Sequence, residues 1–418
     1  MNIGYACLTR GVPGIEYRTS LQKNASETVL LDLIGHNLNA LENAIRYNIR
    51  SGIRLFRISS DLIPFGSSPV NQLNWSDIFA ADWQRIGKLI RDGGQRVSMH
   101  PGQYTVLNSP RDEVVARAVD DLIYHARVLD CLELDNSHKI ILHIGGQYGD
   151  KPAAIERFCA NSQQLPADIR QRLVIENDDR SYTIDDVFEI GKKMAIPVVF
   201  DNLHHLLNHR PGELNMVTWI NRCQSLWQKA DGAQKMHYSQ QDTAKKGGSH
   251  SQTIAVQEFV DFCHSLARKD LDIMLEVKDK NLSARKCLIC IDDKPSIKAL
   301  EEEWAKYKYK VLERSPADYL AIRELLKDKT GEIRLAFYSL IEHALEVIPT
   351  AGQVENAAMH VWGYFKNQIT EQEKKRFLIS LDRFRAGLST IQSVKSQLQK
   401  LAVKYEENYL IESYYFLD

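Results

Sequence analysis

The sequence predicts an eight-stranded (β/α)8 barrel followed by an all-helical region. Short apolar runs of β-strand character alternate with helical stretches over about the first 285 residues, we count eight such runs, and the strand pattern stops near residue 290. Eight strands, each followed by a helix, fit a closed parallel barrel better than an open doubly wound sheet. We therefore expect a TIM barrel over residues 1–290 and a helical extension over residues 291–418.

The predicted strands are short and bounded by turn residues. They span residues 3–7, 55–59, 96–100, 139–143, 173–176, 197–201, 234–239 and 273–277. The helical periodicity between them is clearest over residues 27–50, 112–132, 184–194 and 255–267. Ser26 precedes the first of these helices and is a favourable N-cap.

From residue 297 onward only helical periodicity remains. Helix breaks are predicted at Ser315-Pro316, Gly331, Pro349 and Gly387, and Thr370 with Glu373 has the spacing of a capping box. Residues 297–418 contain 18 Lys and Arg against 18 Asp and Glu. The extension is therefore predicted to be neither a basic arm nor a disordered acidic tail.

The composition is that of an ordinary soluble globular protein. The 418 residues include 53 Lys and Arg against 54 Asp and Glu, which gives a net charge of −1 and excludes a generally basic DNA-coating protein. No apolar run approaches the roughly 18 residues of a membrane span, and the N-terminus lacks a secretory pattern. The seven cysteines include one isolated CxxC, Cys287 and Cys290. We expect reduced thiols and a cytoplasmic protein without membrane contact.

Metal-ligand residue types recur at the predicted strand ends. Strands three to eight end at or near His100, His143, Glu176, Asp201, His237 and Glu276. The carboxyl ends of TIM-barrel strands form the active site, so we expect these side chains to converge. Any single one of them would more often be a packed histidine or an exposed carboxylate. The prediction depends on their convergence.

Two further donors lie close to these strand ends. His204 follows Asp201 by three residues, and His250 lies in a glycine-rich loop after strand seven. Imidazoles and carboxylates without a thiolate favour Mn²⁺, Zn²⁺, Mg²⁺ or Fe²⁺. Eight ligands are too many for one ion, so we expect two or three ions, an arrangement suited to displacement at phosphorus. Glu176 or Glu276 is the candidate for bridging the metals or orienting water.

Lys235 is an unusual residue for this position. The period of two in a strand places it on the same face as His237, so that a lysine would point toward a site that already holds cations. A protonated amine there is disfavoured. The alternatives are that Lys235 extends to solvent, that it is neutral, or that CO2 carbamylates it and makes it an anionic ligand.

Gln103 and Tyr104 follow the turn after His100, at the predicted barrel mouth. An exposed polar and aromatic pair can fill the gap that an expelled base leaves in a duplex, although a loop tyrosine more often covers its own core. Arg10, Lys245 and Lys246 are the candidate phosphate contacts because they lie near predicted strand ends.

Nine segments, in order, give the sequence a recognisable resemblance. They are NIGYAC, LFRISSDLIPF, SMHPGQY, ILHIGG, IENDDRS, VVFDNLHH, KMHYSQQD, GSH and MLEVKDK. Together they resemble the ultraviolet damage endonuclease family. The resemblance implies an ATP-independent repair nuclease that nicks 5′ to cyclobutane pyrimidine dimers, 6-4 photoproducts and commonly abasic sites. It implies Mn²⁺, no nucleotide cofactor and damaged double-stranded DNA as the partner; no protein partner is indicated, and we expect a monomer.

The same resemblance implies roles for individual residues. The metal ligands are His100, His143, Glu176, Asp201, His204, His237, His250 and Glu276. Lys235 is the lysine that the family carries in carboxylated form, and it joins Glu176 and Glu276 as a catalytic candidate. Gln103 and Tyr104 insert opposite the lesion, and Tyr5 corresponds to a lesion-pocket tyrosine.

The sequence departs from the family pattern in two places. Ser68 stands where some members carry a further histidine ligand, and the loop CLTRG is shorter than in some relatives and lacks their asparagine. Three alternatives remain at this point: a metal-dependent sugar isomerase or epimerase, an abasic-site endonuclease with three zinc ions, and a DNA-damage binding module without catalysis.

Overall fold

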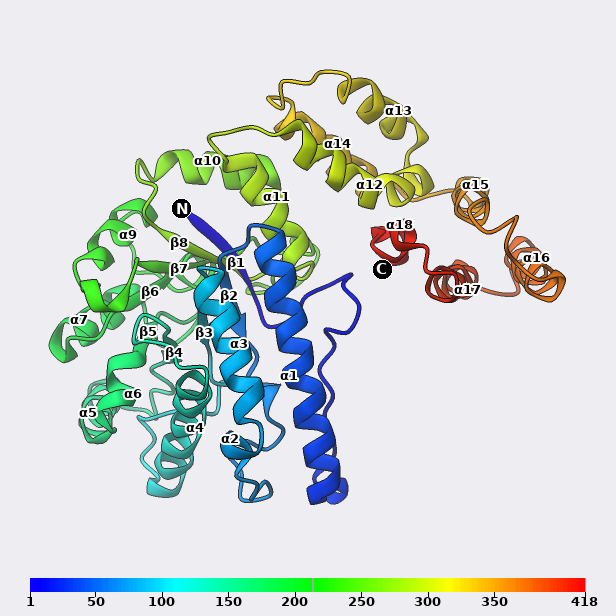
Figure 1. The fold of residues 1–418 in the computed structure, drawn as a ribbon. Coiled ribbons are helices and arrows are strands. Elements are labelled where there is room, and N and C mark those ends of the chain that lie inside the picture. The colour runs from blue at the N-terminus through cyan, green and yellow to red at the C-terminus, as the bar shows by residue number, and fades with distance from the viewer. Residues whose placement is uncertain (213, 418) are drawn as a thin grey trace. The chain divides into compact units, whose positions relative to one another are not determined.

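The computed structural model describes residues 1–212 and 214–417 and closes eight parallel strands into a barrel (Figure 1). Each strand pairs with the next along the chain, and β8 pairs with β1 to close the ring. The predicted TIM barrel is therefore confirmed. The strands are β1 (Asn2–Ala6), β2 (Leu55–Ile58), β3 (Arg96–Met99), β4 (Ile140–His143), β5 (Leu173–Glu176), β6 (Val198–Asp201), β7 (Lys235–Tyr238) and β8 (Asp272–Leu275).

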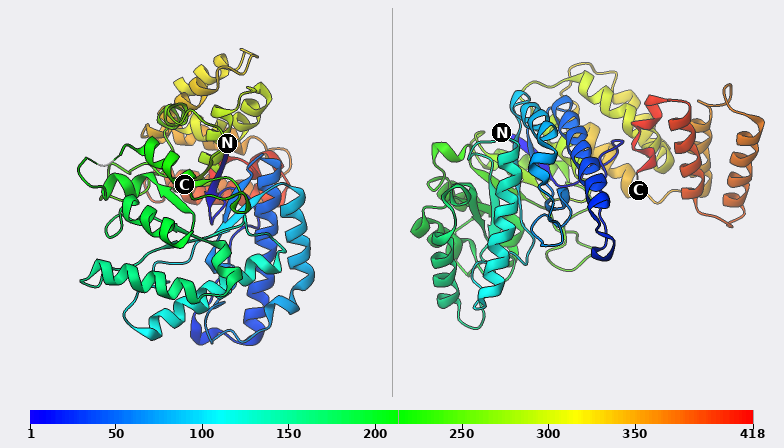
Figure 2. Two further views of the ribbon diagram at one scale, coloured as in Figure 1. Left: turned by 90° about the vertical axis from the view of Figure 1, so that its left-hand side faces the viewer. Right: turned by 60° about the horizontal axis from the view of Figure 1, so that its bottom comes forward.

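Helices follow every strand. They are α1 (Glu27–Arg50), α2 (Trp75–Ile78), α3 (Ala80–Asp92), α4 (Asp112–Cys131), α5 (Lys151–Gln164), α6 (Ala167–Arg172), α7 (Ile184–Met194), α8 (Asn202–Leu207), α9 (Met216–Gln224), α10 (Val256–Ser265) and α11 (Asn281–Ile291). In Figure 2, α1, α3 and α4 lie side by side on the outside of the strands, in blue to cyan. The Ser26 hydroxyl accepts a hydrogen bond from the Val29 amide at 3.4 Å, so α1 begins where the predicted cap places it.

Small and apolar side chains fill the barrel at two places. Ala6, Leu55 and Met274 form one buried group, and Ile141, Val174 and Val199 form another. Side chains two positions apart on a strand share a face, so each residue of the second group lies one step below a predicted metal ligand. These apolar residues therefore support the site from beneath.

Gly4 allows β1 and β2 to approach closely. A Cβ atom at this position would lie 2.0 Å from the Leu55 carbonyl oxygen, a distance that no side chain can tolerate. Only glycine fits this contact without moving a strand.

The chain forms two compact units. The first comprises Met1–Thr9, Gly14–Ile254 and Phe262–Leu288, and contains the barrel. The second comprises Arg10–Pro13, Ala255–Asp261 and the segment from Ile289 to the C-terminus, where Asp418 lies outside the described residues. No helix among the described residues is long and apolar enough to cross a membrane.

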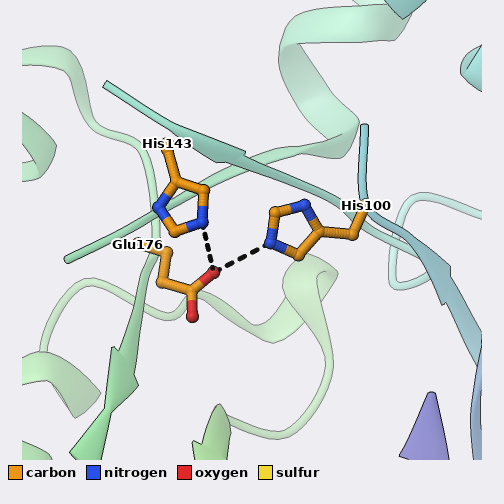
Figure 3. A group of neighbouring side chains, drawn as sticks. All are labelled: His100, His143 and Glu176. Atoms are coloured by element: carbon orange, nitrogen blue, oxygen red, sulfur yellow. Dashed lines mark hydrogen bonds and ion pairs between the residues drawn. The ribbon is translucent and has the colours of Figure 1, made fainter. Parts of the chain in front are cut away.

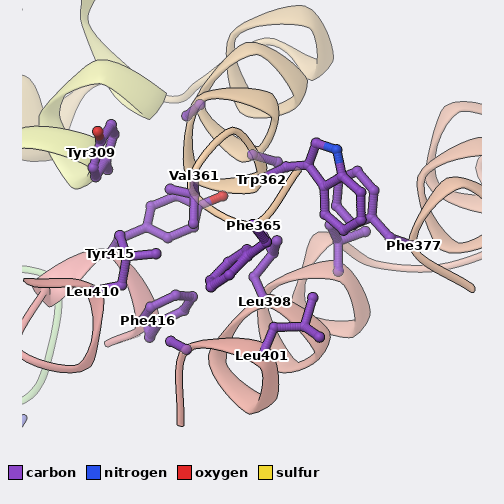
Figure 4. Packing of buried hydrophobic residues seen from close by; sticks show 14 of the residues in the cluster. Tyr309, Val361, Trp362, Phe365, Phe377, Leu398, Leu401, Leu410, Tyr415 and Phe416 are labelled. Atoms are coloured by element: carbon purple, nitrogen blue, oxygen red, sulfur yellow. The ribbon is translucent and has the colours of Figure 1, made fainter. Parts of the chain in front are cut away.

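The second unit is helical. It contains α12 (Ile297–Arg314), α13 (Pro316–Leu325), α14 (Arg334–Glu346), α15 (Ala351–Trp362), α16 (Glu371–Arg385), α17 (Ile391–Lys404) and α18 (Asn408–Ile411). The capping box between Thr370 and Glu373 begins α16 as predicted. Its core includes the parallel rings of Trp362 and Phe377, whose centroids are 4.0 Å apart (Figure 4). This core gives the second unit its own hydrophobic interior.

We expect His138 to make the barrel sensitive to acid. It is buried, its Nδ1 accepts a hydrogen bond from the Val97 amide at 3.0 Å, and burial lowers its pKa to about 4. In the unfolded chain His138 has a pKa near 6.5, so on acidification the unfolded state binds a proton before the folded state does. The stabilisation of the fold by neutral His138 is therefore complete above pH 6.5 and is lost as the pH falls toward 4. The loss amounts to about 3 kcal/mol.

Urea unfolding of wild type and His138→Asn at pH 7 and pH 4.5 checks this expectation. The variant keeps an acceptor near the Val97 amide but cannot titrate, so its free energy of unfolding is expected to fall less on acidification. His264→Asn is the matched control, because His264 is exposed. Equal acid sensitivity in wild type and His138→Asn would contradict the assignment.

Candidate metal centre

The structure brings the eight predicted ligands to the carboxyl ends of the strands. His143, Glu176 and Asp201 are the last residues of β4, β5 and β6. His100 and Glu276 directly follow β3 and β8. His237 lies within β7, His204 in α8 and His250 in the loop after β7. All strands of the barrel run in the same direction, so their carboxyl ends share one rim.

Glu176 lies at the centre of the cluster. Its Oε2 is 3.0 Å from His100 Nε2 and 3.7 Å from His143 Nε2, and both rings point toward this oxygen (Figure 3). Its Oε1 is 2.5 Å from His237 Nδ1 and 3.9 Å from His204 Nδ1. One buried carboxylate therefore contacts four imidazoles.

The remaining ligands extend the cluster on both sides. Glu276 Oε2 is 3.7 Å from His250 Nε2, and Glu276 Oε1 is 3.5 Å from His237 Nδ1. Asp201 Oδ1 accepts a hydrogen bond from the His204 amide at 2.8 Å. The other oxygen, Asp201 Oδ2, is buried and has no hydrogen-bond partner within the described part of the chain.

The side chains fit divalent cations. Two groups of three side chains each have their ligand atoms within 4.8 Å of one another. The first group is His100, His143 and Glu176, and the second is Glu176, Asp201 and His237, so the two groups share the Glu176 carboxylate. Nitrogen and oxygen donors without thiolate are suited to Mn²⁺, Mg²⁺, Fe²⁺ or Zn²⁺. The unpartnered oxygen of Asp201 is a buried polar atom that a cation would satisfy. The shared Glu176 makes a site with more than one ion geometrically reasonable.

The electrostatics keep Glu176 and His237 in the forms that can bind cations. Burial works to raise the pKa of Glu176, but His237 and His143 outweigh it and hold the pKa well below its usual range. Burial lowers the pKa of His237 to about 4, so this ring is neutral at pH 7. Burial raises the pKa of Asp201. Burial works to lower the pKa of His204, but the nearby carboxylates of Asp201 and Glu176 raise it.

Arg57 is a member of the site that the sequence analysis missed. Its Nη2 is 2.6 Å from Glu276 Oε1 and 2.8 Å from His237 Nε2, and the side chain is buried. Burial works to raise the pKa of Glu276, but Arg57 together with His237 and His250 lowers it. An arginine in the otherwise apolar run Leu55–Ile58 was the available signal, because it places a charge inside the barrel.

Asn177 was also missed. Its side chain holds the backbone of Asp201 through two hydrogen bonds, and its carbonyl oxygen accepts one from His204 Nδ1 at 2.9 Å. It therefore fixes the orientation of two candidate ligands without belonging to the ligand set.

Lys235 does not extend to solvent, so that alternative is wrong. The side chain is fully buried, and Nζ has no hydrogen-bond partner among residues 1–212 and 214–417. The start of β7 faces the barrel interior, where the side chain is too deep to reach water. Burial, reinforced by the charge of Arg96, lowers the pKa of Lys235 well below its usual range. Burial therefore favours the uncharged amine.

Four of the residues predicted to contact DNA are exposed. Gln103 and Tyr104 are exposed in the loop after β3, and Tyr104 is 84% exposed. Lys245 and Lys246 are exposed in the loop after β7. Lys245 Nζ is 2.9 Å from Asp242 Oδ2, so this ion pair offsets part of its charge.

Tyr5 is buried beside the loop after β1. It is fully buried, its hydroxyl is 2.6 Å from Thr9 Oγ1, and it donates a hydrogen bond to Asn48 Oδ1 at 2.8 Å. Its ring packs against Phe56. Tyr5 faces α1 rather than the barrel mouth, because alternate residues of β1 point to opposite sides of the strand. Its contact with Thr9 supports the loop after β1, and its correspondence to a lesion-pocket tyrosine stays a prediction.

Three other residues lie in the loop after β1, in the loop after β2 and in α8. Arg10 belongs to the second compact unit. Ser68, where some relatives have a histidine, accepts a hydrogen bond from the Val70 amide in the loop after β2. His205 packs its ring against Phe200 and His209.

Fold and site together define a TIM-barrel protein with a candidate multinuclear metal centre at the carboxyl rim. The family model of UV-endonuclease UvdE matches residues 3–304, and the chain belongs to this family. The resemblance predicted from the sequence is therefore confirmed. A second model, of a protein family of unknown function (DUF1722), matches residues 308–418.

Individual relatives agree with this assignment. A UV DNA damage endonuclease of Clostridium perfringens is 39% identical over 349 residues, which cover 82% of this chain and 83% of the relative. A UV DNA damage endonuclease of Bacillus cereus strain Q1 is 34% identical over 63% of this chain and 83% of its own. The crystal structure of SacUVDE superposes with a TM-score of 0.65 at 36% identity, covering 72% of this chain and 99% of that one.

Proposed function

We propose that the protein is a UV DNA damage endonuclease that hydrolyses the phosphodiester immediately 5′ to a lesion, leaving a 3′-hydroxyl and a 5′-phosphate. The observation that carries the proposal is the cluster of imidazoles and carboxylates around Glu176 in a chain of this family. The proposed substrates are cyclobutane pyrimidine dimers and 6-4 photoproducts in duplex DNA, together with abasic sites. The cluster is the feature that hydrolysis at phosphorus requires.

The proposed cofactors are two or three divalent cations, with Mn²⁺ as the physiological ion. Divalent cations held there would supply Lewis-acid stabilisation of the charge that develops on the phosphate. The residues proposed to hold them are His100, His143, Glu176, Asp201, His204, His237, His250 and Glu276.

The protein's own groups prepare this site. Glu176 and Glu276 stay ionised because neighbouring imidazoles and Arg57 lower their pKa values, and neutral His237 offers a lone pair. Burial lowers the pKa of Lys235 and so favours the uncharged, nucleophilic amine that carbamylation by CO2 requires, and we propose that modification here.

Gln103 and Tyr104 are the proposed lesion readers. The Tyr104 ring is almost entirely accessible and can stack in the gap left by unstacked bases, while Gln103 hydrogen-bonds the exposed base edges. A damaged pair costs less to unstack than an intact one, so this insertion would supply selectivity.

Replacing both Gln103 and Tyr104 by Ala is expected to reduce the preference for irradiated over intact DNA by about tenfold or more, since stacking contributes ~1–3 kcal/mol per base. Metal content, measured by elemental analysis, should not change because neither residue contacts the cluster. Unchanged discrimination in competitive binding would remove their proposed role. Tyr148→Ala, another exposed loop tyrosine, is the matched control.

Incubation of the purified full chain with irradiated supercoiled plasmid and Mn²⁺ tests the function. The expected result is nicking of irradiated plasmid, none of unirradiated plasmid, and loss of nicking with EDTA. Primer extension on a lesion-containing oligonucleotide locates the cut. Tight binding without nicking would contradict the proposal and support a damage-binding module instead.

A further inference from the structure

The second compact unit contains a cleft between α16 and α17 that several positively charged side chains border. Its volume is about 590 Å³, and helices α16 and α17 with the loop between them form its walls. The side chains that define its chemistry are Arg376, Arg383, Ser389, Ser393, Gln397 and Lys400. The chemistry proposed for the barrel uses none of them.

The helical period explains why polar groups line the cleft. Arg376, Ser380 and Arg383 are spaced four and three residues apart, so they lie along one face of α16. The neighbouring stripe of α16 carries Phe377 and Leu381, which are buried in the core shown in Figure 4. The apolar stripe therefore holds the helix in place, while the adjacent polar stripe borders the cleft.

Three of the four cations that line the cleft lack acidic partners in the part of the chain that the structure describes, and the fourth, Lys404, pairs with Glu373, which also lines the cleft. Arg376, Arg383 and Lys400 form no ion pair with any residue in the described ranges 1–212 and 214–417. Elsewhere on α16, Arg385 pairs with Glu355 at 2.5 Å. The helical extension as a whole has balanced charge, so this concentration of unpaired positive charge is local. Like charges that line one cleft focus a positive potential inside it.

A second observation indicates a polar occupant. The hydroxyl oxygen of Ser389, in the loop between the two helices, is buried and has no hydrogen-bond partner in the described chain. Lys404, at the far end, is already engaged by Glu373 at 2.5 Å. Unused donors therefore remain at the Arg376, Arg383, Lys400 and Ser389 positions.

We propose that this cleft binds the sugar–phosphate backbone of one DNA strand, as a contact independent of the metal centre. Guanidinium, ammonium, hydroxyl and amide groups are the donors that proteins direct at phosphate oxygens. No aromatic side chain lines the cleft as described, so bases have nothing to stack on and the binding is independent of sequence. The choice of DNA rests on the proposed endonuclease function, and charge complementarity selects the polyanion.

Replacing Arg376 and Arg383 by Ala in the full chain tests this inference. The matched control is Lys366→Ala with Lys375→Ala, which removes the same charge from exposed positions outside the cleft. Binding of a labelled undamaged duplex is followed by fluorescence anisotropy in EDTA at several salt concentrations. Each phosphate contact contributes about 0.9 to the slope of log K against log salt, so the cleft variant should lose about 1.8.

The expected result is that slope change with at least a tenfold loss of affinity at low salt, while the control behaves as wild type. Thermal unfolding should be unchanged because both arginines are exposed. Equal effects in the cleft and control variants would overturn the inference. Nicking of irradiated plasmid at saturating protein separates the two proposals. If the wild type binds DNA through the cleft but does not nick it, the proposed endonuclease function is refuted. If the wild type nicks DNA while the cleft variant and the control variant bind DNA equally well, the proposed DNA-binding role of the cleft is refuted.

Discussion

Replacing Glu176 by Gln is expected to abolish nicking of irradiated plasmid, with the rate falling by more than about 100-fold, while binding to damaged DNA largely persists. Glu176 contacts four of the candidate metal ligands, so its loss weakens both ligand groups at once. Changes to groups that merely orient a ligand already cost 10–100-fold, and removing a shared carboxylate should cost more. The isosteric amide adds no volume but removes the negative charge that holds cations.

The measurement combines single-turnover nicking, bound metal per protein and anisotropy with irradiated duplex. Glu156→Gln is the matched control, because Glu156 is an exposed carboxylate on α5. If Glu176→Gln cuts at the wild-type rate, the cluster is not the catalytic site and the proposed function loses its principal support.

Replacing Arg57 by Met should lower the free energy of unfolding of the metal-free barrel by ~3–5 kcal/mol. Arg57 is buried beside Glu276 at 2.6 Å, so removing it leaves a carboxylate uncompensated in the barrel interior. Adding Glu276→Gln to this variant should restore most of the loss, because no unpaired charge then remains.

Urea unfolding in EDTA, followed by barrel tryptophan fluorescence, provides the comparison. Arg46→Met is the control, since Arg46 pairs with Glu42 at the surface of α1, where such a pair contributes less than about 1 kcal/mol. An Arg57→Met barrel as stable as this control would show that other groups neutralise Glu276.

The barrel and several helix ends were predictable because local chemistry specifies them. Eight apolar runs separated by helical periods leave few other ways to bury both faces of each strand. Helix α1 begins after Ser26, and α7 begins at a capping box between Thr183 and Asp186, so side-chain oxygens define both boundaries. The loops carry no comparable period, and their conformations could not be derived.

The candidate ligands could be predicted because strand ends in a parallel barrel share one rim. The inward position of Arg57 could not, since its partners Glu276 and His237 lie far away in the sequence and only the closed barrel brings them together. The burial of the Tyr5 ring could not be predicted, because a family correspondence says nothing about which side of β1 the ring occupies. For Lys235, the general preference of lysine side chains for solvent was the wrong guide, because the alternation of side chains along β7 places this one in the barrel interior.

The apolar group formed by Ile141, Val174 and Val199 beneath the ligands has a kinetic consequence. A hydrated ion cannot readily cross such a layer, since that would strip its water without replacing it. Ions must then enter and leave by the same opening that the substrate covers. Chelators should consequently inactivate the free protein much faster than the protein that is already bound to DNA. An ion should not be able to exchange while the protein is turning over a bound DNA strand.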